Sequence, residues 1–152
     1  MRELAPPSVF EALDENHRLR YWTAKLADDD PHQHVTIAEI GSKLVGIGAV
    51  GRPSDPIFGS RAEIKNLYVL PGYQGQGIGT HILKDLAAHA KAAGYGSVTL
   101  SVVKGNKRAA RFYEARRAKK IGEFRDPGPI WRSDNVVYGW DEIDQLMSWG
   151  PE

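Results

Sequence analysis

Apolar and polar residues follow one another along the first third of the chain in patterns typical of helices and then of strands. From residue 7 to residue 27, apolar side chains recur at loosely helical spacing, which predicts one or two helices. Two β-rich runs follow at 35–40 and 44–50. The Gly41-Ser42 pair between them is typical of a two-residue turn, because glycine adopts positive φ without strain. These runs therefore predict a β-hairpin.

The middle of the chain has the pattern of a strand, a helix and a second strand. Residues 62–69 are apolar enough for a central strand. From Ile78 to Ala90, apolar residues lie three and four apart, which places them on one face of a helix that Gly94 ends. Residues 98–103 predict a buried strand. This order implies a right-handed crossover between two parallel strands.

The last third predicts a short helix and two further strands. Asn106 can cap a helix that carries Tyr113 on its apolar side. The runs 119–124 and 135–140 predict an antiparallel pair that closes the chain. The order of elements is typical of an α/β (α+β) fold, in which a mixed central sheet has a parallel β-α-β core and flanking helices.

Composition and charge fit one ordinary globular domain, which we expect to span residues 1–152. Hydrophobic residues make up 41% and charged residues 26% of the chain, far from the composition of disordered segments. The net charge of +1 creates no overall field that would attract nucleic acid or a membrane. The first residues show no signal-peptide pattern, and no run approaches the roughly 20 apolar residues of a membrane span, so we expect a cytoplasmic protein.

The absence of cysteine excludes disulfides, thiol catalysis and thiolate metal sites. The histidines show no spacing typical of metal ligands or of a catalytic triad. We therefore interpret each as a plain exposed side chain and predict no metal site. These residues are His17, His32, His34, His81 and His89.

A glycine-rich segment lies where the central strand gives way to the helix. Gly75, Gly77 and Gly79 let the backbone approach a ligand closely, and the first-turn N–H groups of the helix would point at it. This combination favours a phosphate. It is no nucleotide P-loop, because no Gly-Lys-Ser/Thr follows, and its spacing is GxGxG rather than the dinucleotide GxGxxG. A glycine-rich turn without a ligand is the alternative.

Two motifs resemble those of the GNAT acyltransferase superfamily. The run Gln74-Gly75-Gln76-Gly77-Ile78-Gly79 is similar to that family's Q/R-x-x-G-x-G/A pyrophosphate loop. Downstream, Asn106 to Glu114 is similar to its N-x-x-A-x-x-x-Y-E segment. The detailed resemblance covers about residues 62–123, and the order and spacing of the two motifs make it specific.

The resemblance implies a set of cofactor contacts. The loop backbone would hold the CoA pyrophosphate, and the strand 67–69 would bind the pantetheine arm, with the Val69 N–H donating to the thioester carbonyl. Asn106 would contact the cofactor, and Tyr113 would lie beside the sulfur and protonate the departing thiolate. The implied cofactor-binding residues are Leu67, Tyr68, Val69, Gln74, Gly75, Gln76, Gly77, Ile78, Gly79, Thr80, Asn106 and Tyr113.

The candidate catalytic residues are Tyr113 and Glu63. A primary amine is protonated at neutral pH and must lose a proton before it attacks, so a base is needed. Glu63 stands where many members of the family carry an acid and is our hypothesis for the base, acting directly or through water. A bulge in the strand would change the face that Glu63 occupies, and an exposed or salt-bridged glutamate is the alternative.

Two departures from the family pattern bear on the fold. After its tyrosine the family usually has a Gly-Phe pair that ends the helix, whereas Arg117 and Ala118 stand here. Arginine in a left-handed cap costs about 1 kcal/mol more than glycine, so we expect the helix to run on and the next strand to shift. No strand-like run precedes Ser8, so we expect the family's first strand to be missing. An uncovered sheet edge favours a homodimer.

The resemblance implies an N-acetyltransferase that moves the acetyl group of acetyl-CoA directly to a primary amine in a ternary complex. No serine has an evident His-Asp relay and no thiol is present, so a covalent acyl-enzyme is not expected. The acceptor stays open between a small-molecule amine and a peptide amine. The alternative function is a catalytically silent acyl-CoA-binding regulatory module. Neither hypothesis involves nucleic acid or a membrane.

Overall fold

The computed structural model describes residues 30–125 and 134–148, and these residues contain a mixed sheet with flanking helices. The sheet order is β1-β2-β3-β4-β6-β5. The strands are β1 (His34–Ile40), β2 (Lys43–Gly51), β3 (Ala62–Val69), β4 (Val98–Val103), β5 (Lys119–Arg125) and β6 (Asp134–Trp140). The α-helices are α3 (Ile78–Ala92), α4 (Lys107–Ala115) and α5 (Ile143–Met147). The predicted mixed α/β fold is confirmed, while the helices predicted within 7–27 lie outside the described residues.

The described residues fall into two compact units. The larger unit comprises residues 30–100 and 139–148, with β1 to β3, the start of β4, α3 and α5. The smaller unit comprises residues 101–125 and 134–138, with the end of β4, α4, β5 and most of β6. That residues 1–152 form a single domain stays a prediction.

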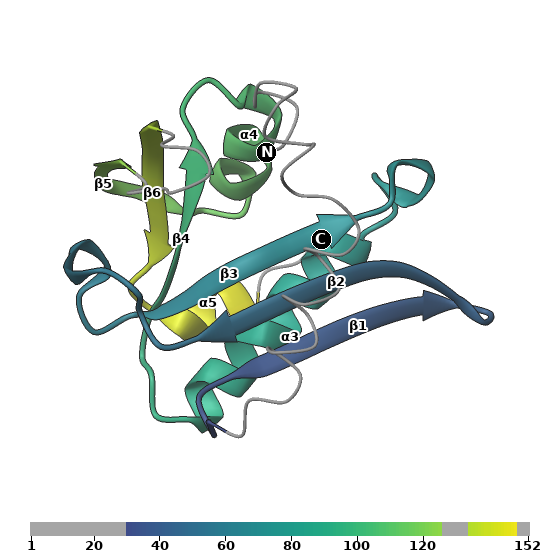
Figure 1. Ribbon diagram of the computed structural model, residues 1–152, viewed down its shortest axis with the longest axis horizontal. Coiled ribbons are helices and arrows are strands. Elements are labelled where there is room, and N and C mark those ends of the chain that lie inside the picture. The colour runs from purple at the N-terminus through teal and green to yellow at the C-terminus, as the bar shows by residue number, and fades with distance from the viewer. Residues whose placement is uncertain (1–29, 126–133, 149–152) are drawn as a thin grey trace. The chain divides into compact units, whose positions relative to one another are not determined.

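The larger unit is built on an antiparallel hairpin and one parallel pair. Strands β1 and β2 pair antiparallel around a turn at Gly41, whose φ is 64°, as predicted. Strand β3 pairs antiparallel with β2 and parallel with β4 (Figure 1). The parallel register joins Ala62 to Val98 and Glu63 to Thr99, at the start of both strands. The predicted strand, helix and parallel strand are therefore confirmed.

Helix α3 packs closely on this sheet because β2 presents glycines to it. A Cβ atom on Gly46 would lie 2.8 Å from Cδ1 of Ile82, and one on Gly48 would lie 2.6 Å from Cγ2 of the same residue. Ile82 and Leu86 are both buried, and Figure 1 shows α3 against one face of β1, β2 and β3. A side chain at either glycine would therefore force Ile82 or the neighbouring backbone to shift.

Helix α5 was not predicted from the sequence. It spans five residues, too few to show a helical period, and it buries Ile143 and Leu146. The Ile143 N–H donates to the carbonyl oxygen of Gly96 at 3.0 Å, and Lys91 Nζ lies 2.6 Å from Asp144 Oδ1. These contacts fix α5 beside the C-terminal end of α3. Among the described helices, none is long and apolar enough to cross a membrane.

In the smaller unit, the end of α4 corrects one prediction. The N–H of Ala118 donates to the Tyr113 carbonyl at 3.1 Å, and the N–H of Arg117 donates to the Glu114 carbonyl at 2.9 Å. This is the hydrogen-bond pattern of a Schellman cap, and Arg117 adopts the left-handed conformation with φ of 69°. The expectation that the helix runs on past Arg117 is wrong, because the two cap hydrogen bonds offset the strain. Strand β5 begins at Lys119 without the expected shift.

Candidate active site

The C-terminal end of β3 directs two backbone N–H groups away from β2. The N–H of Leu70 donates to the Val45 carbonyl at 2.9 Å, and hydrogen-bonded pairs alternate in an antiparallel register. The backbone groups of Tyr68 therefore pair with Ile47, and those of Leu67 and Val69 point to the other edge of β3. In agreement with this direction, the carbonyl of Val69 is not used by β2 and accepts a hydrogen bond from Gln74 Nε2 at 3.0 Å.

The glycine-rich loop joins β3 to α3 through a single 3-10 turn, Pro71–Tyr73. Gly75 and Gly77 have φ of 81° and 83°, and a Cβ atom at either position would meet no heavy atom within 4 Å. Gly77 is the N-cap of α3 and supplies no side-chain hydrogen bond to the helix. The loop thus leads into the N-terminus of a 15-residue helix, where first-turn N–H groups and the positive end of the helix dipole are found. An anion fits this arrangement.

Glu63 is buried at the start of β3 and is held by the loop that precedes the strand. Its Oε1 atom accepts hydrogen bonds from the Ser54 N–H at 2.9 Å and the Ser54 hydroxyl at 2.6 Å. The side chain is 9% exposed, so the alternative of a surface glutamate does not hold. A bulge follows directly: Ala49 faces Asn66 and Val50 faces Ile64, which leaves Lys65 as the extra residue.

In the smaller unit, Asn106 directly precedes α4 and Tyr113 lies within it. Asn106 caps the helix, because its Oδ1 atom accepts from the Ala109 N–H at 3.2 Å. Tyr113 is 6% exposed, and its ring meets that of Phe112 edge to face at 5.2 Å between centroids. Burial raises the pKa of the Tyr113 phenol well above its ordinary range, opposed by the nearby Arg116 guanidinium. The phenol therefore keeps its proton at physiological pH.

The candidate residues thus form two groups. In the larger unit, the Gln74–Val69 hydrogen bond brings the glycine loop to the end of β3, and Glu63 lies at the start of the same strand. In the smaller unit, Asn106 caps the helix that carries Tyr113. The contact between Ser54 and Glu63 could not be predicted from the sequence, since nothing in the local pattern of that loop indicates it.

Two of the histidines are not the plain exposed side chains that we expected. The Nδ1 atom of His32 lies 2.7 Å from the Tyr95 hydroxyl. The ring of His34 stacks on the ring of His89, with centroids 3.3 Å apart and planes inclined by 14°. His32 and His34 are partly buried, so the prediction of a plain exposed side chain is wrong for these two residues. The one sequence signal for the contact between His34 and His89 is the spacing of Asp85 and His89, which places both residues on one face of α3.

A mixed sheet with a glycine-rich loop between a central strand and the start of a long helix is typical of α/β proteins that bind a phosphate-bearing ligand. The model of the acetyltransferase (GNAT) family matches residues 1–117, and the chain belongs to this family. It is accordingly an acetyl-CoA-dependent N-acetyltransferase. The resemblance stated from the two sequence motifs is confirmed.

Relatives and solved structures agree with this assignment. The mouse thialysine N-epsilon-acetyltransferase is 33% identical over 135 residues, which cover 81% of this chain and 78% of that protein. The ribosomal-protein-alanine N-acetyltransferase from Brucella melitensis has a TM-score of 0.63 at 21% identity, covering 84% of this chain and 78% of that one. A GNAT acetyltransferase from Elizabethkingia anophelis with acetyl-CoA bound has a TM-score of 0.60 at 20% identity, covering 83% and 82%. These two structures share the fold.

Proposed function

We propose that this chain transfers the acetyl group of acetyl-CoA directly to a primary amine of a small molecule or peptide. The observation that carries the proposal is the N-terminus of α3. There the N-cap residue Gly77 is left-handed and has no side chain with which to cap the helix, and a Cβ at Gly75 or Gly77 would meet no heavy atom within 4 Å. These features fit a pyrophosphate held by backbone N–H groups, as the family resemblance implies for residues 74–80.

We also propose that the end of β3 binds the pantetheine arm. The N–H groups of Leu67 and Val69 lie on the edge of β3 away from β2, so they can pair with an extended ligand as a neighbouring strand would. We assign the Val69 N–H to the thioester carbonyl, where it would stabilise developing negative charge. Since the backbone of Tyr68 pairs with β2, its contribution would come from its side chain, which is 47% exposed.

The residues of α4 take their roles from the family resemblance. Asn106 uses its carbonyl oxygen to cap the helix, so its amide nitrogen is the group that we assign to the cofactor. Tyr113 keeps its phenolic proton because burial raises its pKa, and we assign it the protonation of the departing thiolate. When bound, acetyl-CoA would supply the activated acyl group.

Glu63 is our candidate for the group that removes the proton from the amine. Both hydrogen bonds from Ser54 go to Oε1, so Oε2 is the atom that we assign to proton acceptance, directly or through water. Replacement by glutamine keeps an acceptor for Ser54 and removes the base. We expect Glu63→Gln to flatten the acidic limb of the pH profile of kcat/KM. An unaltered limb would assign the proton to another group.

The acceptor that we propose is the amine at the end of a flexible side chain or at a peptide N-terminus. The mouse relative is named for the Nε amine of thialysine, and the Brucella structure for an alanine of a ribosomal protein. Both acceptors are primary amines on otherwise different molecules. This shared chemistry supports the class of acceptor that we propose, a primary amine.

The test is release of free CoA thiol from acetyl-CoA in the presence of a panel of amines. The panel contains thialysine, lysine, a polyamine and a peptide with an N-terminal alanine, each with a matched acceptor whose amine is already acetylated. We expect thiol release with at least one free amine and none with its acetylated form. Binding of acetyl-CoA without release on any amine would favour the catalytically silent regulatory module.

A further inference from the structure

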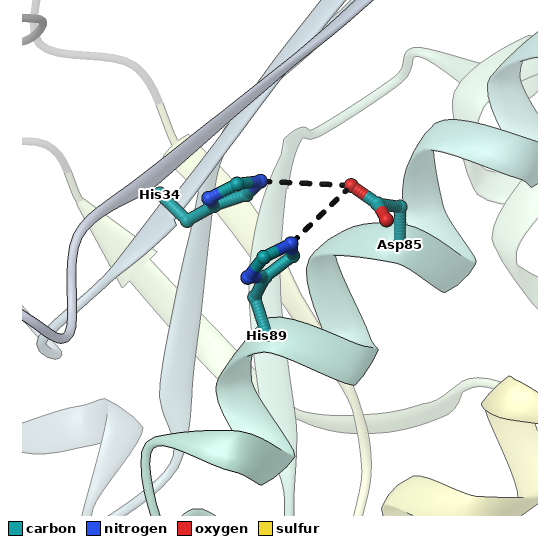
Figure 2. Close-up of side chains that lie close together, drawn as sticks. All are labelled: His34, Asp85 and His89. Atoms are coloured by element: carbon teal, nitrogen blue, oxygen red, sulfur yellow. Dashed lines mark ion pairs between the residues drawn. The ribbon is translucent and has the colours of Figure 1, made fainter.

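The larger unit gathers three metal-ligating side chains on the face that α3 turns toward β1. Figure 2 shows His34 from β1 with its ring against His89, and Asp85 one turn before His89 on α3. The Nε2 atoms of His34 and His89 lie 3.6 and 3.8 Å from the same Oδ2 atom of Asp85. These distances are too long for hydrogen bonds. Two imidazoles thus converge on one carboxylate oxygen.

The spacing of these atoms fits a transition-metal ion. One ligand atom from each of the three residues lies within 4.8 Å of the others. Ligands held at about 2.0–2.1 Å around a tetrahedral zinc ion are about 3.3 Å apart, so small torsions of exposed side chains would close the site. The side chains of His34, Asp85 and His89 are 31%, 46% and 46% exposed, which leaves access for an ion and for water as a fourth ligand.

The types of ligand atom indicate which class of metal ion the site would bind. Two imidazole nitrogens and one carboxylate oxygen suit zinc and similar divalent transition metals, whereas calcium and magnesium prefer oxygen ligands.

A fourth side chain orients the carboxylate. The Thr36 hydroxyl donates to Asp85 Oδ2 at 2.5 Å, and Thr36 lies two residues after His34 on the same face of β1. Hydrogen bonds of this kind fix the direction of a ligating carboxylate and support metal affinity. Both elements thus contribute a ligand, and β1 also contributes the group that positions the ligand from α3.

We propose that His34, Asp85 and His89 form a binding site for a divalent transition-metal ion of the zinc class, which fastens β1 to α3. The bound ion would link the outer strand of the β1-β2 hairpin to the helix that opens at the glycine loop. The role of the ion is structural, since these residues are separate from the proposed acetyl-transfer groups. It would stabilise the folded protein by mass action.

The experiment adds zinc chloride to chelator-treated protein and records both calorimetric titration and thermal unfolding. At zinc about 100-fold above Kd, we expect the melting temperature to rise by roughly 5–10 °C. Cobalt in place of zinc should give the visible absorption of a four-coordinate site. We expect His34→Ala and His89→Ala each to weaken zinc binding by about tenfold or more, since each removes one of three protein ligands. Thr36→Val should weaken it by a smaller factor.

The matched control is His81→Ala, which removes another exposed histidine from the same helix. We expect this variant to bind zinc as the unaltered protein does. Zinc that leaves the melting temperature of the unaltered protein unchanged would overturn the proposal. Equal zinc affinity in His34→Ala would also overturn it, because the ion would then not link β1 to α3. His89→Ala keeps the test valid if His34→Ala misfolds, since alanine is the best helix former.

Discussion

Arg117 closes helix α4 in a conformation that glycine adopts with less strain. Its φ of 69° is the one positive value among non-glycine residues in the described part of the chain. We predict that Arg117→Gly raises the free energy of unfolding by about 1 kcal/mol, or the melting temperature by roughly 2–4 °C. Chemical denaturation measures the free energy of unfolding. Arg111→Gly, within the exposed face of the same helix, should instead lower it by about 1 kcal/mol. A loss of stability in Arg117→Gly would mean that the arginine side chain itself stabilises the cap.

Tyr113 is buried, and it is also the residue that we propose protonates the departing thiolate. Because its pKa is raised, the phenol stays protonated up to at least about pH 10, and the pH profile of turnover should show no alkaline limb from this group. We predict that Tyr113→Phe lowers kcat by about 10- to 1000-fold with little change in the Kd of acetyl-CoA. Steady-state kinetics and calorimetry measure the two quantities. Full turnover in the variant would restrict Tyr113 to packing.

At the scale of elements, the contact between β2 and α3 holds the glycine loop in place. The helix can lie this close to the strand because Gly46 and Gly48 carry no side chain. The loop joins β3, the neighbour of β2, to the first residue of α3. The direction in which the first-turn N–H groups point therefore depends on how α3 packs against the sheet.

We predict that Gly48→Ala lowers the free energy of unfolding by about 1–3 kcal/mol. The added Cβ would lie 2.6 Å from Ile82 Cγ2 and 3.2 Å from the Asn66 carbonyl oxygen, and the backbone atom cannot move aside cheaply. Gly72→Ala is the matched control, because its Cβ would meet no heavy atom within 4 Å. Denaturant titration compares the two. Equal stabilities would show that α3 adjusts to the methyl group without cost.

At the scale of the whole molecule, binding of acetyl-CoA should stabilise the folded chain. We predict that acetyl-CoA at about 100-fold above its Kd raises the melting temperature by roughly 5–10 °C. Gly77→Asp should abolish the rise, because a carboxylate would occupy the place proposed for the pyrophosphate. Gly41→Asp introduces the same charge at another left-handed glycine with open surroundings and should keep the rise. A rise that persists in Gly77→Asp would place the cofactor away from the loop.

Most elements of the fold could be predicted because their signals are local. The strand at 62–69 and the hairpin around Gly41 follow from residue types within a few positions, as does the cap at Asn106. The glycine loop could be predicted for the same reason, since the residues of its motif are neighbours in the sequence. The five-residue helix α5 escaped prediction because it depends on burial against α3 rather than on a helical period.

The sequence by itself determined the family, the order of the elements and the loop that we propose for the pyrophosphate, since each is encoded in neighbouring residues. The tertiary structure alone decided which distant residues meet. Ser54 holds Glu63, and His34 stacks on His89 beside Asp85. The tertiary structure also decided that α4 ends in a cap at Arg117. The stability of that cap depends on the balance between two hydrogen bonds and backbone strain. Contacts between distant residues arise from packing, and packing leaves no repeating pattern along the chain.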